Sequence, residues 1–115
     1  MNRAEKNYNR GVIYYESGKY TEAVEEFSRA IELNPTDFKN FYNRGIIFEE
    51  LERYSEAIHD LNRTIVLNPN FSKAYNNRGI IFTKLKNYES ALLDFEKAVE
   101  LNPEDVKSHN RGENF

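Results

Sequence analysis

The tripeptide Asn-Arg-Gly occurs four times in this chain, beginning at Asn9, Asn43, Asn77 and Asn110. The intervals between successive copies are 34, 34 and 33 residues. A motif that returns at a nearly constant interval of this length indicates a repeat protein, in which one supersecondary unit stacks on copies of itself. The fold is therefore set by what a single unit contains.

Each unit contains two segments with helical periodicity. In the first unit, apolar residues recur at three- and four-residue steps at Ala23, Phe27, Ala30 and Ile31, which predicts an amphipathic helix. The first helices are predicted over about 4–16, 38–51 and 72–85, and the second helices over about 20–33, 54–67 and 88–101. Every unit closes on Leu-Asn-Pro. This tripeptide is expected to end the second helix, because proline disfavours helical geometry in the residue before it.

A glycine lies inside the first helix of every unit, at Gly11, Gly45 and Gly79. Glycine in a helix interior costs about 1 kcal/mol relative to alanine, so its recurrence needs a reason. We predict that the second helix passes close to the first at this point. The expected partners are the small residues of the second helices, Ala23, Ala57 and Ala91.

This order of glycine, aromatic, alanine, aromatic, alanine and proline over 34 residues resembles the tetratricopeptide repeat. The resemblance covers residues 4–103, and three copies agree in phase. It implies an all-α fold, a right-handed α-solenoid of three helix hairpins, and we expect a short seventh helix after them. The predicted organisation is a single domain over 1–115, with repeats at about 4–37, 38–71 and 72–105 and a partial capping helix at 106–115.

An arginine precedes each of these glycines, and an acid follows it sixteen residues later in every unit. The pairs are Arg10 with Glu26, Arg44 with Asp60, and Arg78 with Asp94. Our hypothesis is that each arginine pairs across the helices with the acid of its own unit or of the preceding unit. The alternative is that both side chains are solvated. In either case the arginine is structural rather than catalytic.

A second face of each first helix points away from the glycine and, by the helical spacing rule, collects tyrosine, asparagine and aliphatic residues. In tetratricopeptide proteins the corresponding face lines a concave groove, so the resemblance implies a peptide site there. Tyrosine offers rigid contact area, and asparagine can hydrogen-bond a peptide backbone. The alternative is that the amides bond a neighbouring helix. The predicted groove residues are Tyr8, Asn9, Val12, Tyr15, Lys39, Tyr42, Asn43, Ile46, Lys73, Asn76, Asn77, Ile80 and Lys84.

These features predict a protein–protein interaction module, acting as a scaffold or adaptor, that binds a peptide or a segment of a partner protein. Some tetratricopeptide domains hold the C-terminal carboxylate of chaperones with lysine, asparagine and arginine side chains. The matching positions here are Tyr8, Val12, Asn43, Lys73 and Asn77. Only Asn43 and Lys73 have the residue types of that subfamily, so a co-chaperone function is disfavoured.

The last unit differs from the others at Leu93, which stands where earlier units have Glu25 and His59. Together with Leu92, it makes the last helix apolar over more of its circumference. Three interpretations stay open: the chain was cut from a longer array, it buries this end against another copy, or Leu93 is a lone exposed leucine. The second interpretation predicts a self-associating scaffold, a homo-oligomer through its C-terminal end.

The composition argues against several other functions. The chain has no cysteine, which removes disulfides and thiolate chemistry. His59 and His109 lie in no catalytic constellation, so we predict no enzyme activity and no metal or cofactor. The net charge of −3 comes from interspersed acids and bases, which disfavours nucleic-acid binding. Apolar runs of at most four residues are too short for membrane insertion, no signal peptide is visible, and we expect a cytoplasmic protein.

Overall fold

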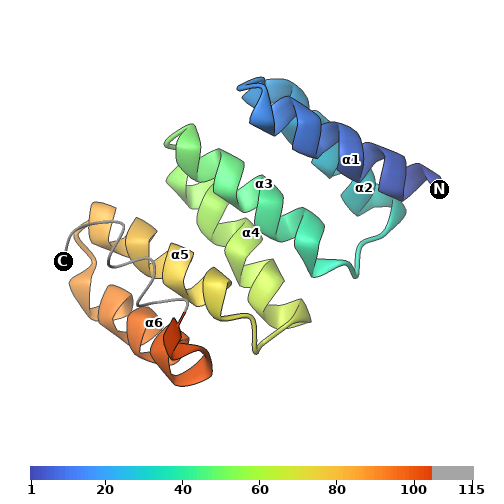
Figure 1. The fold of residues 1–115 in the computed structure, drawn as a ribbon. Helices are drawn as coiled ribbons and strands as arrows, with labels where there is room; N and C mark the ends of the chain where they lie inside the picture. The colour runs from blue at the N-terminus through green and yellow to red at the C-terminus, as the bar shows by residue number, and fades with distance from the viewer. Residues whose placement is uncertain (105–115) are drawn as a thin grey trace. The chain divides into compact units, whose positions relative to one another are not determined.

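The computed structural model describes residues 1–104, which form six α-helices and no strand (Figure 1). The helices are α1 (Arg3–Glu16), α2 (Tyr20–Leu33), α3 (Phe38–Glu50), α4 (Tyr54–Leu67), α5 (Ser72–Lys84) and α6 (Tyr88–Leu101). The predicted bounds are confirmed to within one residue at each helix end. The predicted seventh helix at 106–115 lies outside the described residues.

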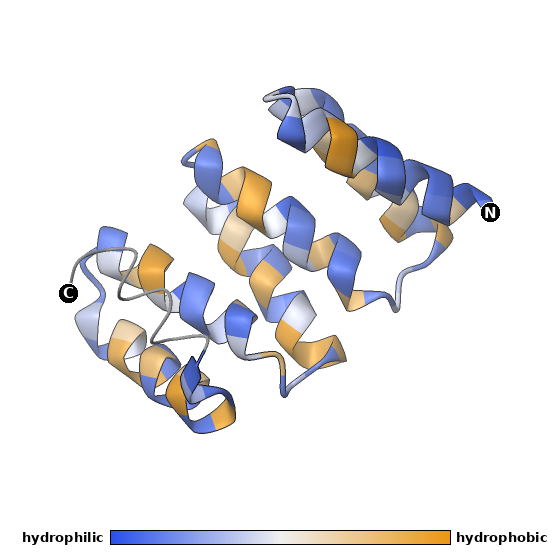
Figure 2. Ribbon diagram, in the orientation of Figure 1, coloured by the Kyte–Doolittle hydropathy of each residue, from blue (hydrophilic) through white to orange (hydrophobic). Residues whose placement is uncertain are grey.

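The helices fall into two compact units. Unit 1, Met1–Leu67, contains the hairpins α1–α2 and α3–α4, with α2 packed on α3. Unit 2 begins at Asn68 and contains the hairpin α5–α6. Figure 2 shows hydrophobic and hydrophilic residues interleaved along each of the helices, as expected of amphipathic helices. That residues 1–115 form a single domain with the repeat bounds given above stays a prediction.

Side-chain caps start two of the helices in unit 1. At α1, the Asn2 side chain accepts a hydrogen bond from the Glu5 backbone N–H at 2.8 Å, and the Glu5 carboxylate accepts one from the Asn2 N–H at 3.4 Å. This reciprocal capping box satisfies donors that the first helical turn leaves unpaired. At α3, the Asp37 carboxylate accepts a hydrogen bond from the Lys39 N–H at 3.0 Å. The two caps fix where α1 and α3, which carry several of the predicted groove residues, begin.

The core of unit 1 is centred on Phe27 of α2. Its side chain is buried together with Ala23 and with Ile47 of α3. A β-carbon placed on Gly11 would lie 2.8 Å from Cζ of Phe27, a separation too short for unstrained carbon atoms. The glycine therefore allows α1 to lie directly against the phenylalanine ring.

The close approach predicted at the glycines is confirmed, but the predicted partners are only partly correct. In unit 2, the nearest neighbour of a β-carbon at Gly79 would be the ring of Phe95, 2.9 Å away. At Gly45 the nearest atom to such a β-carbon would be the Asp60 Cβ at 3.2 Å, and the carbonyl oxygen of an expected partner, Ala57, would follow at 3.4 Å. In the other two hairpins the helix separation is set by an aromatic ring, which reaches farther across the interface than an alanine methyl.

The three loops within the helix hairpins share one backbone conformation. The φ angle is 77° at Gly18, 59° at Glu52 and 64° at Lys86. This left-handed region is readily adopted by glycine, but it brings the β-carbon of other residues close to the following carbonyl oxygen. The second and third loops therefore keep the turn geometry of the first loop at the expense of backbone strain.

We expect Lys86→Gly to raise the free energy of unfolding by about 0.5–1 kcal/mol, because relief of the left-handed strain outweighs the added freedom of the unfolded chain. Urea denaturation of the variant and the parent measures this change. Lys86→Ala is the matched control, since it removes the same charge but keeps the β-carbon. An equal gain from both variants would show that the strain is not the cause.

Candidate functional site

Two ion pairs hold the first helix of a repeat against the second. Arg44 donates to Asp60 through Nε and Nη2, both at 2.7 Å, and Asp60 is 1% exposed. Arg78 donates to Asp94 in the same two-point geometry, at 2.8 and 2.6 Å. The hydrogen bonds to Asp94 raise the pKa of the Arg78 guanidinium, although burial opposes them. The predicted pairing within each repeat is confirmed for these two arginines, and its role is structural.

The first repeat departs from this rule. Among the described residues, Arg10 makes no ion pair, and its side chain is exposed. Glu26 is buried and instead accepts a hydrogen bond from Arg29 Nη1 at 3.4 Å, while its Oε1 has no hydrogen-bond partner. Glutamate is one methylene longer than aspartate, so its carboxylate can turn back along α2 to Arg29. The prediction of an Arg10–Glu26 pair is therefore wrong.

Five of the predicted groove residues come together around one pocket of unit 1, which we call the apolar pocket. Its volume is about 240 Å³. The lining residues are Tyr8, Val12 and Tyr15 from α1, Phe27 from α2, and Asn43, Ile46 and Ile47 from α3. None of these side chains carries a formal charge at neutral pH. The pocket can therefore accept an apolar group, with the Asn43 amide as a hydrogen-bonding partner.

Two aromatic contacts shape this pocket. The ring of Tyr8 meets that of Phe27 edge-on, with centroids 5.8 Å apart and an interplanar angle of 75°, a favourable arrangement for aromatic pairs. Tyr15 packs on Tyr20 at 5.6 Å, and its hydroxyl donates to Glu50 at 3.4 Å. Burial, followed by the negative charge of Glu50, raises the pKa of the Tyr15 hydroxyl above its usual value. These contacts therefore constrain the positions of both tyrosine rings.

Phe27 and Ile47 line the pocket but were not among the predicted groove residues. In the sequence, Phe27 belongs to the apolar pattern of the second helix, and in the structure its ring packs against α1. The ring is long enough to pass under Gly11 and also form the floor of the pocket. A large aromatic residue opposite a helix glycine was the signal in the sequence that could have revealed this second role.

A second pocket, which we call the polar pocket, shares Tyr8 with the first and has a volume of about 290 Å³. Two more predicted groove residues, Asn9 and Lys39, line it. The other lining residues are Asn2, Ala4, Glu5, Asn34, Asp37 and Asn40. Asn40 is buried and its Oδ1 has no hydrogen-bond partner. Tyr42 is half-buried and lines neither of these two pockets.

The remaining predicted residues lie on α5 in unit 2. Lys73 and Lys84 are exposed, and Asn77 and Ile80 are half-buried. Asn76 is only 8% exposed, and its Oδ1 has no hydrogen-bond partner. Its side chain therefore belongs to the interior of the described structure more than to an open surface.

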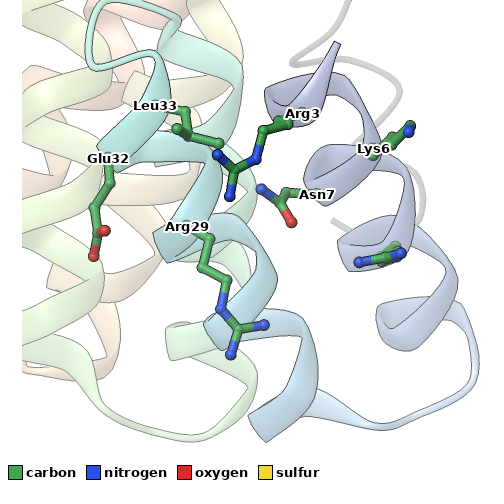
Figure 3. A pocket seen from close by; sticks show the side chains of 7 residues that line it. Arg3, Lys6, Asn7, Arg29, Glu32 and Leu33 are labelled. Atoms are coloured by element: carbon green, nitrogen blue, oxygen red, sulfur yellow. The ribbon is translucent and has the colours of Figure 1, made fainter. Parts of the chain in front are cut away.

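A third hollow, of about 600 Å³, lies between α1 and α2, and we call it the basic hollow (Figure 3). It is lined by Arg3, Lys6, Asn7, Arg10, Arg29, Glu32 and Leu33. Figure 3 shows Arg3 and Asn7 close together between the two helices, with Arg29 on α2. In the second repeat the place of Asn7 is taken by the buried ring of Phe41, so the smaller asparagine leaves this space open.

Other chemistry is sparse within residues 1–104. That part of the chain has no group of three His, Asp or Glu side chains that could bind a metal ion. The His59 side chain is 72% exposed, and its Nδ1 lies 3.8 Å from Oδ1 of Asp60. None of the described helices combines the length and the apolar character that crossing a membrane requires.

Comparisons with known proteins agree with the repeat architecture. A model of the tetratricopeptide repeat matches residues 39–71 and 72–105, and a second model of the same repeat matches residues 11–52. The chain therefore belongs to the tetratricopeptide repeat family. Domains of this family are typically non-catalytic interaction modules. No curated protein matches the chain.

Solved structures extend this result. The second tetratricopeptide domain of Spaghetti (RPAP3), bound to the HSP90 peptide SRMEEVD, is 30% identical with a TM-score of 0.84, covering 88% of this chain and 94% of that one. The second tetratricopeptide domain of human RPAP3, in complex with the HSP70 peptide SGPTIEEVD, is 31% identical with a TM-score of 0.83. The match covers 88% of this chain and 84% of that one. The Arabidopsis OM64 domain is 26% identical with a TM-score of 0.86, covering 96% of both chains.

Proposed function

We propose that this protein is a cytoplasmic peptide-binding scaffold or adaptor whose ligand inserts an apolar side chain into the apolar pocket of unit 1. The observation that carries the proposal is the pocket itself, which gathers Tyr8, Val12, Asn43 and Ile46 around the buried ring of Phe27. Similar domains bound to peptides support a binding function of this class. The chemistry required is recognition without catalysis or a cofactor.

The composition of the pocket sets the type of ligand. A volume of about 240 Å³ is large enough for one leucine, methionine or phenylalanine side chain, and burial of such a group stabilises a complex by about 1.5–3 kcal/mol. Tyr8 and Val12 stand where domains that hold a chaperone carboxylate have lysine and asparagine. Because neither residue offers a charge or an amide, the ligand is anchored by an apolar side chain rather than by a terminal carboxylate.

Asn43 supplies the directional part of the recognition. Its amide can donate to a carbonyl and accept from an N–H of the same extended peptide. The rest of the peptide then runs past Tyr8 into the polar pocket, where Asn9 and Lys39 offer further hydrogen bonds. Backbone bonds of this kind fix the position of the peptide, while the apolar pocket selects its anchoring residue.

We expect Val12→Lys to weaken peptide binding at least tenfold, because it places an ammonium group where an apolar side chain must be buried. The probe is a fluorescein-labelled, C-terminally amidated heptapeptide, selected on the parent protein from a random displayed library and measured by fluorescence anisotropy. Asn43→Ala should weaken binding by at least about fivefold, because it removes both the hydrogen bond that the amide donates and the one that it accepts.

Val66→Lys is the matched control, because Val66 is 66% exposed on α4 and lies outside both pockets. It should leave the affinity unchanged. The peptide SRMEEVD with a free carboxylate, used as a competitor, separates the two ligand types. The proposal is contradicted if Val12→Lys improves binding of SRMEEVD-like peptides and the parent selects only peptides with a free C-terminus.

A further inference from the structure

The contact between α2 and α3 shows how a first helix packs on the second helix of the preceding repeat. Ile47 of α3 is 1% exposed and shares a cluster with Ala23 and Phe27 of α2. Arg44 Nη1 donates to Ser28 Oγ of α2 at 3.0 Å. The higher-numbered residue of α3 lies beside the lower-numbered part of α2, so the two helices run antiparallel in a defined register.

The equivalent face of α1 is uncovered in the described structure. Ile13 stands 34 residues before Ile47 but is 63% exposed. Arg10, the counterpart of Arg44, is exposed and has no ion-pair partner among residues 1–104. Arg3 and Lys6 lie on the same stripe and, with Arg10, line the basic hollow. This face of α1, which we call the head face, is therefore basic with one apolar residue at its centre.

On α6, we consider the face equivalent to the side of α2 that contacts α3. This face is acidic, whereas the head face is basic. Leu92 and Val99 stand in the places of Val24 and Ile31, and they are 60% and 45% exposed. Glu96 takes the place of Ser28, whose hydroxyl accepts the bond from Arg44. Glu89 and Glu100 add two more acids on the same side, and Glu100 also pairs with Lys97 of the same helix at 3.5 Å. We call this the tail face. In it, the Glu96 carboxylate replaces the neutral Ser28 hydroxyl as the acceptor.

We propose that the tail face of one copy docks on the head face of a second copy in the geometry of the α2–α3 contact. Carrying the register across by the repeat interval places Glu96 beside Arg10 and Leu92 beside Ile13, and about one helical turn further on it brings Glu100 toward Lys6. Each position pairs an acid with a base or one apolar residue with another. This charge complementarity selects a second copy over an unrelated helix.

The two faces are different surfaces of one chain, so the contact is head-to-tail and does not close on itself as a two-fold dimer does. Such a contact generates open chains of increasing length. Neither face includes Tyr8, Val12 or Asn43, so assembly and peptide binding are separable. Assembly would line up several peptide sites in one particle, which raises avidity for a partner with repeated segments.

Sedimentation-equilibrium ultracentrifugation from 1 to 500 μM tests the proposal directly. The parent should show a mass that rises with concentration beyond two chains. Arg10→Glu and Glu96→Arg, each alone, should weaken the association at least tenfold, because like charges then face each other. Mixing the two single variants in equal amounts should restore it, because every head–tail contact in an alternating chain is then between opposite charges.

The matched controls are Lys86→Glu and Glu52→Lys, which make the same changes of charge outside both faces. Glu52 and Lys86 are equivalent positions in the loops of the second and third repeats, so each control introduces the residue type that the other loop already has. Both controls should associate like the parent. Circular dichroism of each variant verifies that the helices remain. A parent mass of one chain at every concentration, or a mixture that stays as dissociated as its components, would overturn the proposal. Peptide affinity measured on the same samples keeps this outcome separate from the binding function.

Discussion

Replacing Arg44 with alanine is expected to lower the free energy of unfolding by about 3–5 kcal/mol. The change leaves Asp60, which is 1% exposed, as a buried carboxylate without the two-point ion pair that satisfies it. It also removes the bond to Ser28 that links α3 to α2. Urea denaturation followed by circular dichroism measures the loss, which is a large part of the stability of a chain of this size.

Two comparisons identify the cause of this loss. Arg10→Ala removes the same type of residue at the equivalent place in the first repeat, where no ion pair with a described residue forms, and should change stability by less than about 0.5 kcal/mol. The double variant Arg44→Ala/Asp60→Ala should recover part of the loss, since no buried charge is then left unpaired. A coupling energy below about 0.3 kcal/mol in this cycle would contradict a stabilising pair.

Phe27→Ala is the second substitution with a large expected effect, a loss of about 3–5 kcal/mol of unfolding free energy. The ring fills the space under Gly11, packs on Tyr8 and forms the floor of the apolar pocket. Its removal leaves a cavity between α1 and α2 that the surrounding side chains can fill only in part. Thermal and urea denaturation of the variant measure the effect.

A finer version of this experiment uses the repeat itself as a guide. The second repeat has Leu61 where the first has Phe27. A β-carbon at Gly45 would lie 3.4 Å from the Leu61 Cγ, whereas one at Gly11 would lie 2.8 Å from the Phe27 ring. Gly11→Ala should therefore destabilise the parent but be tolerated in the Phe27→Leu background, where the ring is absent. Equal effects of Gly11→Ala in both backgrounds would show that the ring does not determine the need for glycine.

Much of the fold could be predicted because the same sequence pattern occurs in each repeat. The Leu-Asn-Pro closures and the apolar periodicity locate the helices to within one residue, and the sixteen-residue interval from Arg44 to Asp60 gives the ion pair. The identity of the residue that presses on Gly11 could not be read in this way. The spacing places both Ala23 and Phe27 near α1, and only the three-dimensional packing decides which of them reaches the glycine.

The candidate site was predicted less completely, for the same physical reason. Helical spacing brings Tyr8, Val12 and Asn43 to one face, and the structure gathers them around a pocket. The pocket is also lined by Phe27 and Ile47, whose side chains belong to the core as well. The absence of an Arg10–Glu26 pair could not be predicted from the spacing either. The extra methylene of Glu26 and the nearby Arg29 direct its carboxylate to Arg29 instead.

Methyl and amide NMR during a peptide titration tests the proposed function most directly. The probe is the amidated, library-selected heptapeptide, added to isotope-labelled protein with assigned resonances. We expect saturable shifts at the methyl groups of Val12 and Ile46 and at the Asn43 side-chain amide, with little change at Val66. Shifts that leave these three residues unmoved, and cluster elsewhere on the chain, would contradict a peptide site in the apolar pocket.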